Sequence, residues 1–264
     1  MKLGFIGCGN MATAIIKGIL SKDLVPKSAV YASNSTVEHA DATRAALGVT
    51  TTTDNRYVVK NSDIVFLSVK PQHYAHVIEE VREFIREDHI VVTIAPGKTI
   101  AWLEEQFAKP VKIVRSMPNT PALVGEGLTS YCPNALVEDA ELARIESLLG
   151  SYGKITRLPE HLIDAASAVG GSAPAWTYMF IEALADGGVA EGLPRAAAYE
   201  IAAQTVLGSA KMVLETGKHP AQLKDEVCSP GGSTIAGVEA LEQHVFRGTV
   251  MGAVRSCAAK ARSL

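Results

Sequence analysis

Two glycines near the start of the chain are spaced to bind a dinucleotide. Gly7, Gly9 and Ala12 form the pattern Gly-x-Gly-x-x-Ala, between a short apolar run and an amphipathic stretch. In that context Gly7 permits a tight turn, Gly9 lets pyrophosphate approach the backbone, and Ala12 keeps helix and strand close. The motif therefore predicts cofactor binding by Gly7, Gly9, Asn10, Met11 and Ala12 at a helix N-terminus. A structural glycine turn without a ligand is the alternative.

The end of the second predicted strand indicates which dinucleotide is bound. The segment Ser33-Asn34-Ser35-Thr36 contains no acid, and the first one is Glu38. An Asp or Glu at this point would hold the ribose hydroxyls of NAD and repel the extra phosphate of NADP. Contacts from Ser33, Asn34 and Ser35 are therefore expected to favour NADP, with NAD as the alternative cofactor. Ser35 or Thr36 could equally cap the next helix.

Three further loops follow predicted strands. Ligands of parallel sheets bind outside the carboxyl ends of the strands. The loops are Val69-Lys70-Pro71, Ala95-Pro96-Gly97 and the stiff segment Met117–Pro121. A solvated lysine and ordinary turn chemistry are the alternative interpretations. The residues expected to contact the cofactor are Val69, Lys70, Pro71, Ala95, Gly97 and Asn119.

A glycine-rich segment late in the chain has the residues to hold a small anion. Ser229-Pro230-Gly231-Gly232-Ser233-Thr234 precedes an apolar helical stretch. Its glycines would expose backbone amides where a helix dipole favours negative charge. The segment predicts a carboxylate site, and a capped helix start without a ligand is the alternative.

Composition narrows the class of protein. The chain has 264 residues, of which 47% are hydrophobic and 20% charged, as in a globular protein with a core. A net charge of -3 with scattered basic residues argues against a nucleic-acid partner. No apolar run reaches the roughly 18 residues of a membrane span, and the first run lacks signal-peptide features, so no membrane partner is expected. Cys8, Cys132, Cys228 and Cys257 lack metal-binding spacing, which predicts free thiols in a cytoplasmic protein and no metal.

Alternating apolar runs and amphipathic stretches predict an α/β domain with a doubly wound, mostly parallel sheet of the Rossmann type. After Pro159 the pattern becomes wholly helical and rich in alanine and glycine. We place a NAD(P)-binding domain at residues 1–159 and a helical domain at 160–264. The small apolar residues of this helical part are too many for it to bury alone, which predicts a homodimer.

The expected strands and helices follow from the same patterns. The strands are expected at 3–6, 29–32, 64–69, 90–94, 112–115, 129–132 and 155–157. The helices are expected at 11–20, 74–85, 100–107, 137–149, 173–191, 195–216, 232–244 and 246–263.

Taken together and in order, these motifs resemble those of the pyrroline-5-carboxylate reductases. The resemblance covers essentially the whole chain, and Ser229–Thr234 after Leu223-Lys224-Asp225 is its most specific part. It implies a Rossmann domain, a helical dimerisation domain and dimers that assemble into decamers of five dimers. It also implies reduction of 1-pyrroline-5-carboxylate to L-proline with NAD(P)H. The matching segments are Gly7–Ala12, Val69–Pro71, Met117–Pro121, Asp186–Gly188, Gly192–Arg195, Gln222–Asp225 and Ser229–Thr234.

The resemblance also implies roles for individual residues. Asn55 would approach the phosphate on the adenine ribose. Ala173 and Trp176 depart from the glycine and tyrosine usual in the family, which puts in doubt a hydrogen bond from that aromatic residue. The substrate carboxylate and ring nitrogen would be lined by Ser229, Gly231, Gly232, Ser233 and Thr234.

The hydride acceptor in such a reaction is an imine carbon. No His, Asp or Glu in the sequence is obviously reserved as the acid for the imine nitrogen. Our hypothesis is that the Thr234 hydroxyl hydrogen-bonds this nitrogen and orients the ring, while water or protonation in solution supplies the proton.

Two other functions compete with this hypothesis. One is another NADP-linked reductase, such as a broader imine reductase or a 3-hydroxyacid dehydrogenase. The dehydrogenase would need a lysine as its acid, and Lys211 and Lys224 are the candidates. A catalytically silent NADP-binding regulator would bind NADPH and turn over no imine.

Overall fold

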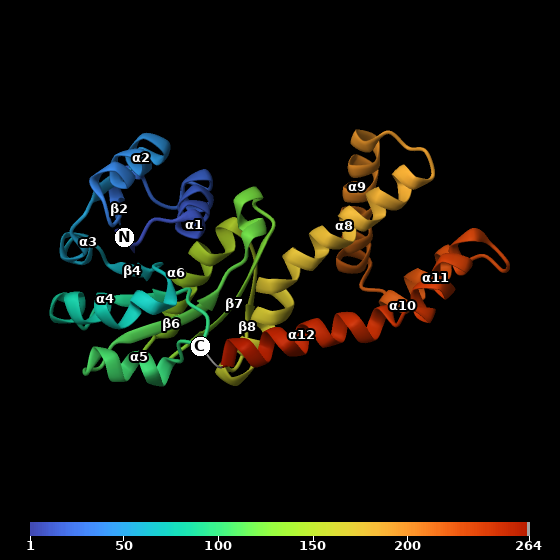
Figure 1. The fold of residues 1–264 in the computed structure, drawn as a ribbon. Coiled ribbons are helices and arrows are strands. Elements are labelled where there is room, and N and C mark those ends of the chain that lie inside the picture. Colours follow the sequence, from blue (N-terminus) through green and yellow to red (C-terminus); the bar gives the residue numbers. More distant parts are fainter. Residues whose placement is uncertain (263–264) are drawn as a thin grey trace. The chain divides into compact units, whose positions relative to one another are not determined.

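The computed structural model describes residues 1–262 and divides into two compact units (Figure 1). The first unit contains Met1–Ser172 together with the described residues from Cys257 onward, and the second contains Ala173–Ser256. This division falls after the predicted boundary at 159/160, because the intervening segment packs on the sheet. The buried Arg115 side chain forms ion pairs with Glu160 at 3.3 Å and with Asp164 at 2.6 Å.

The described part of the first unit contains one eight-stranded sheet in the order β3-β2-β1-β4-β5-β6-β7-β8. All neighbouring strands are parallel except β6 and β7, which are antiparallel. The predicted doubly wound, mostly parallel sheet is therefore confirmed. The strands are β1 (Leu3–Ile6), β2 (Val30–Ser33), β3 (Thr50–Thr52), β4 (Ile64–Leu67), β5 (Ile90–Thr93), β6 (Lys112–Met117), β7 (Gly127–Pro133) and β8 (Gly153–Arg157).

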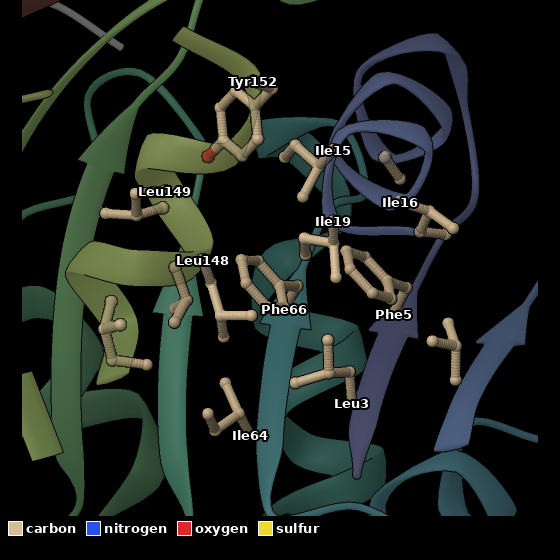
Figure 2. Close-up of a cluster of buried hydrophobic side chains, with 14 of the residues drawn as sticks. Leu3, Phe5, Ile15, Ile16, Ile19, Ile64, Phe66, Leu148, Leu149 and Tyr152 are labelled. Atoms are coloured by element: carbon tan, nitrogen blue, oxygen red, sulfur yellow. The ribbon is translucent and has the colours of Figure 1, made fainter. Parts of the chain in front are cut away.

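Helices cover both faces of this sheet, which explains why the central strand β4 is apolar at every position. On β4, Ile64 and Phe66 face one core cluster, whereas Val65 and Leu67 face another. Figure 2 shows the first cluster, where Phe5 stacks on Phe66 between the sheet and the flanking helices. The helices of this unit are α1 (Asn10–Ser21), α2 (Val37–Leu47), α3 (Asn55–Lys60), α4 (Tyr74–Val81), α5 (Ile100–Phe107), α6 (Asp139–Leu149) and α7 (Ile163–Ala166).

The segment from residue 37 to 60 forms three elements whose bounds the sequence pattern did not predict: α2, β3 and α3. Helix α2 buries only Ala40 and Leu47, and β3 is a three-residue edge strand. Because so little apolar surface is buried there, no helical or alternating apolar period marks these elements.

The second unit is helical, as predicted. It contains one further helix that was not expected, α10, which begins directly at Pro220. None of the described helices is both long and apolar enough to cross a membrane. The helices are α8 (Ala173–Ala190), α9 (Arg195–Thr216), α10 (Pro220–Val227), α11 (Ser233–Gln243) and α12 (Phe246–Arg262), and the last turns of α12 belong to the first unit. The end of the helix predicted at 246–263 lies outside the described residues.

Candidate active site

The Gly7–Ala12 loop connects the carboxyl end of β1 to the N-terminus of α1. Gly7 adopts φ +84, and a β-carbon there would lie 2.6 Å from Val69 Cγ1, so only glycine fits. A β-carbon on Gly9 would meet no atom within 4 Å, which leaves space for a ligand against the backbone. Ala12 is buried in the core cluster, as its role in helix–strand packing requires.

The start of α1 suits an anion. Gly9 is its N-cap and provides no side-chain hydrogen bond, and the first turn contains no acidic residue. The first backbone N–H groups of a helix lack partners within the helix and attract negative charge. In addition, Oδ1 of Asn34 is buried beside this loop without a hydrogen-bond partner, while its Nδ2 donates to the Cys8 carbonyl at 3.2 Å. These features fit a dinucleotide with its pyrophosphate at the loop.

Ser33 contributes to the loop from within the protein. It is 1% exposed, and its carbonyl accepts hydrogen bonds from the N–H groups of Gly7 and Cys8. Its hydroxyl donates to Asn55 Oδ1 at 2.6 Å, and Asn55 Nδ2 donates to Glu80 Oε2 at 2.7 Å. The predicted cofactor residues Ser33 and Asn55 thus lie together. Glu80 joins them from α4, and no sequence signal pointed to it.

Three further residues at this edge, Ser35, Thr36 and Arg56, are exposed. Ser35 lies at the surface, and Thr36 is the N-cap of α2, where its side chain accepts from His39 N–H at 3.2 Å. Of the two residues considered as a cap for this helix, Thr36 is therefore the one that caps it. Arg56, directly after Asn55, places its Nε 4.0 Å from Glu80 Oε1 and adds a cation near this edge.

The loops after β4 and β5 are tied together by a tyrosine. The buried Tyr74 hydroxyl donates to the Leu67 carbonyl and accepts from Ile94 N–H at 3.3 Å. Burial raises the pKa of Tyr74 far above its ordinary value, so it remains a neutral donor. Tyr74 therefore fixes the spacing of the segments that contain Val69-Lys70-Pro71 and Ala95-Pro96-Gly97. Lys70 itself is exposed.

Asn119 has a structural partner on each side. Its Nδ2 donates to the Gly170 carbonyl at 2.9 Å, and its Oδ1 accepts from Leu128 N–H at 2.8 Å. Gly170 belongs to the π-helical turn η7 (Ser167–Ser172). Asn119 thus connects the loop after β6 to this turn, and turns of this kind often occur at functional sites.

The loops after β1, β5 and β6 contribute to the lining of a cavity of about 400 Å3 at the carboxyl edge of the sheet. Its wall includes Met11 after the glycine loop, Pro96 after β5 and Pro118 after β6, together with Gly171 of the π-helical turn. Its volume lies within the roughly 300–1,000 Å3 of small-molecule sites. Of these four residues, only Met11 was predicted as a site residue.

The predicted substrate residues lie in the second unit at the start of α11. Gly231 has φ +66, and Gly232 N–H donates to the Ser229 carbonyl at 3.0 Å. Gly232 is the N-cap of α11 and has no side-chain cap, so the capped-start alternative does not describe this helix. Ser229, Gly231, Ser233 and Thr234 are exposed, so their backbone and hydroxyl groups are accessible to an anion.

Comparisons with known proteins identify relatives along the whole chain. Residues 160–264 match the family model described as pyrroline-5-carboxylate reductase dimerisation, and residues 2–97 match NADP oxidoreductase coenzyme F420-dependent. The pyrroline-5-carboxylate reductase of Escherichia coli is 42% identical over 263 residues, which covers 100% of this chain and 98% of that protein. The Pisum sativum enzyme of that name is 44% identical over 264 residues, covering 99% and 95%. The crystal structure of Plasmodium falciparum pyrroline carboxylate reductase with NADP bound is similar with a TM-score of 0.91, 33% identity and coverage of 100% and 97%.

A doubly wound sheet with an uncapped glycine loop at its carboxyl edge is typical of dinucleotide-binding proteins, and the match of residues 2–97 to an NADP oxidoreductase model makes the class an NAD(P)-dependent oxidoreductase. Relatives more than 40% identical along the whole chain narrow that class. The chain belongs to the pyrroline-5-carboxylate reductase family.

Proposed function

We propose that this chain reduces 1-pyrroline-5-carboxylate to L-proline with NADPH, the final step of proline biosynthesis. The 42% identity to the Escherichia coli reductase over the whole chain is the observation that carries the proposal. The open backbone at Gly9 and the uncapped start of α11 supply the two anion sites that such a reaction needs. NADPH oxidation in the presence of pyrroline-5-carboxylate tests the proposal, with NADH run in parallel. An enzyme that binds NADPH but turns over no imine would contradict it and favour the silent regulator.

The cofactor-binding residues are proposed at the carboxyl edge of the sheet. Gly7, Gly9, Asn10, Met11 and Ala12 would hold the pyrophosphate through backbone amides. Asn34 and Ser35 would lie near the adenine ribose with Asn55, which Ser33 orients from behind. When bound, the reduced nicotinamide supplies the hydride. The further contacts proposed are Val69, Lys70, Pro71, Ala95 and Gly97, with Asn119 holding the loop after β6 against the π-helical turn.

The substrate would be held at the start of α11. Ser229, Gly231, Gly232 and Ser233 would bind the carboxylate through hydroxyls and backbone amides. The Thr234 hydroxyl would donate to the ring nitrogen and orient the C=N bond. The imine carbon accepts the hydride, the C=N bond becomes a single bond, and the nitrogen takes one proton from solution, which leaves a secondary amine.

Thr234 is testable by two substitutions. Thr234→Ala removes the hydroxyl and is expected to lower kcat by about tenfold or more, the cost of one oriented hydrogen bond in a transition state. Binding of NADPH should change little. Thr234→Ser retains the hydroxyl and should retain most of the turnover. Equal kcat in Thr234→Ala and the wild type would contradict the assignment.

Assembly as a homodimer follows from the surface of the second unit. Its buried cluster consists of three alanines, Ala185, Ala198 and Ala202. Many of its large apolar side chains are exposed, among them Met179 at 67%, Leu207 at 57% and Leu214 at 81%. Monomers rarely expose large apolar patches, so a second copy is the expected cover. The match of residues 160–264 to a dimerisation family model supports dimerisation by this part of the chain and supports the 159/160 boundary.

We extend the proposal to a decamer of five dimers, whose molar mass light scattering would measure. The proposed location is the cytoplasm.

The hydroxyacid dehydrogenase alternative finds little support. Its candidate acids are exposed or paired lysines: Lys211 lies 3.5 Å from Glu215, and Lys224 lies 2.5 Å from Asp225. The hydrogen bond with Asp225 raises the pKa of Lys224, which makes it a weaker acid.

A further inference from the structure

One wall of the cavity at the carboxyl edge of the sheet is formed by a helix and not by a loop that follows a strand. Cys257, Lys260 and Ala261 of α12 line the cavity together with Met11 and Pro118. All of its lining residues belong to the first compact unit, since the described residues from Cys257 onward are part of that unit. The spacing of 257, 260 and 261 places the three side chains on one face of the helix. Ala259, which does not line the cavity, is exposed.

The position of the cavity identifies the half of the dinucleotide that fits it. A doubly wound sheet binds one nucleotide on each side of its first strand. The adenine side is at β2, where Ser33 and Asn55 lie, and the order β2-β1-β4-β5-β6 places the cavity on the other side. Met11 lies two positions after Gly9 and connects the pyrophosphate loop to the cavity.

The lining of the cavity suits a flat heteroaromatic ring. Met11, Ile94, Pro96, Met117 and Pro118 give it a mostly apolar surface, and Ser167 and Ser172 add two hydroxyl-bearing residues. Small-molecule pockets combine an apolar wall with a few polar groups in this way. We propose that the cavity receives the nicotinamide and that the last turns of α12, through Cys257 and Ala261, form one wall of it. This inference rests on the proposed reductase function and adds residues to its cofactor site.

Substitution of one alanine tests the wall against a matched control on the same helix. In A261W the indole would occupy the cavity, whereas in A259W the same side chain would point to solvent. Dissociation constants would be measured by calorimetry for NADPH and for adenosine 2′,5′-bisphosphate, which has the adenine side but no nicotinamide. We expect A261W to weaken NADPH binding by about tenfold or more and to leave binding of the bisphosphate within about twofold of wild type. A259W should change neither ligand.

If A261W folds poorly, A261L provides the same test with a smaller side chain. A261L should weaken NADPH binding by an intermediate factor, again without effect on binding of the bisphosphate. Unchanged NADPH binding in A261W and A261L, or equal losses for both ligands, would overturn the inference. The proposed function can fail separately. If the wild-type protein does not turn over pyrroline-5-carboxylate but A261W still weakens NADPH binding selectively, the proposed reaction is contradicted. The assignment of α12 as a wall of the nicotinamide cavity is then retained.

Discussion

The Ser33 hydroxyl donates to Oδ1 of Asn55 over 2.6 Å and so joins the end of β2 to the first residue of α3. Asn55 can take this position because its Nδ2 donates to Glu80 at 2.7 Å. The orientation of the Asn55 amide is thus set by an acceptor on one side and a donor on the other. Since Asn55 is proposed to lie beside the adenine ribose phosphate, this arrangement should influence the choice between NADPH and NADH.

Replacement of Asn55 by Asp should reduce the preference for NADPH. The carboxylate would keep an acceptor for Ser33 but would face Glu80 and the cofactor phosphate with a like charge. We expect the KM for NADPH to rise by about tenfold and that for NADH to change by about twofold or less. Steady-state kinetics with both cofactors measure this. The double variant N55D/E80Q removes the repulsion from Glu80 and should recover part of the loss, and a parallel rise of both KM values would contradict the prediction.

The two glycines of the loop should respond differently to alanine. Gly7→Ala would place a β-carbon 2.6 Å from Val69 Cγ1 in a left-handed conformation, so it should destabilise the fold. Gly9 has φ -87 and no protein atom near its β-position, so Gly9→Ala should fold as stably as wild type or gain about 0.4–1 kcal/mol. Gly9→Ala should instead raise the Kd for NADPH, because the methyl group would occupy the space proposed for the pyrophosphate. Urea unfolding and calorimetry separate the two effects, and a Gly9→Ala variant with wild-type affinity would argue against a ligand at Gly9.

Loss of the Tyr74 hydroxyl should loosen two loops that are proposed to contact the cofactor. Tyr74→Phe leaves the partly buried Ile94 N–H and the carbonyl of buried Leu67 without this partner. We expect a loss of about 1–3 kcal/mol in the free energy of unfolding. The KM for NADPH should rise while kcat changes less, because these loops are proposed to contact the cofactor and not the substrate. Tyr57→Phe, at an exposed position, is the control.

His89 should make the fold sensitive to acid. It is fully buried, its Nδ1 accepts from Arg86 N–H at 3.0 Å, and its Nε2 has no partner. Burial, followed by the charge of Arg86, lowers the pKa of His89. The unfolded chain, with a His pKa of about 6.5, therefore binds the proton more readily than the folded protein. Stability should be complete above about pH 6.5 and decrease as the pH falls toward the lower folded pKa.

The variant His89→Asn should flatten this dependence. Its side-chain oxygen could still accept from Arg86 N–H, but the side chain does not titrate. Urea unfolding between pH 5 and pH 8 measures the effect, with His76→Asn on the exposed side of α4 as the control. A wild-type curve as steep as that of His89→Asn would show that another group causes the dependence.

The sequence by itself determined the features that depend on neighbouring residues. Helices α5 and α9 were predicted with their observed ends, Ile100–Phe107 and Arg195–Thr216, and Pro194 marks the start of α9. The glycine loop was predicted because turn, close approach and helix start all lie within six residues. The order of motifs also predicted the family, which the relatives confirm.

Only the tertiary structure decided which distant residues meet. Asn55 and Glu80 are 25 positions apart, and Asn119 reaches Gly170 across 51 positions. The wall formed by α12 lies more than 240 positions from Met11, as the chain numbering shows. Such pairs leave no periodic signal, because each depends on how the sheet orders its strands and where a helix ends against it. The same reason explains why the short, polar elements α2, β3 and α3 were missed: their positions are fixed by the neighbouring strand and not by their own apolar pattern.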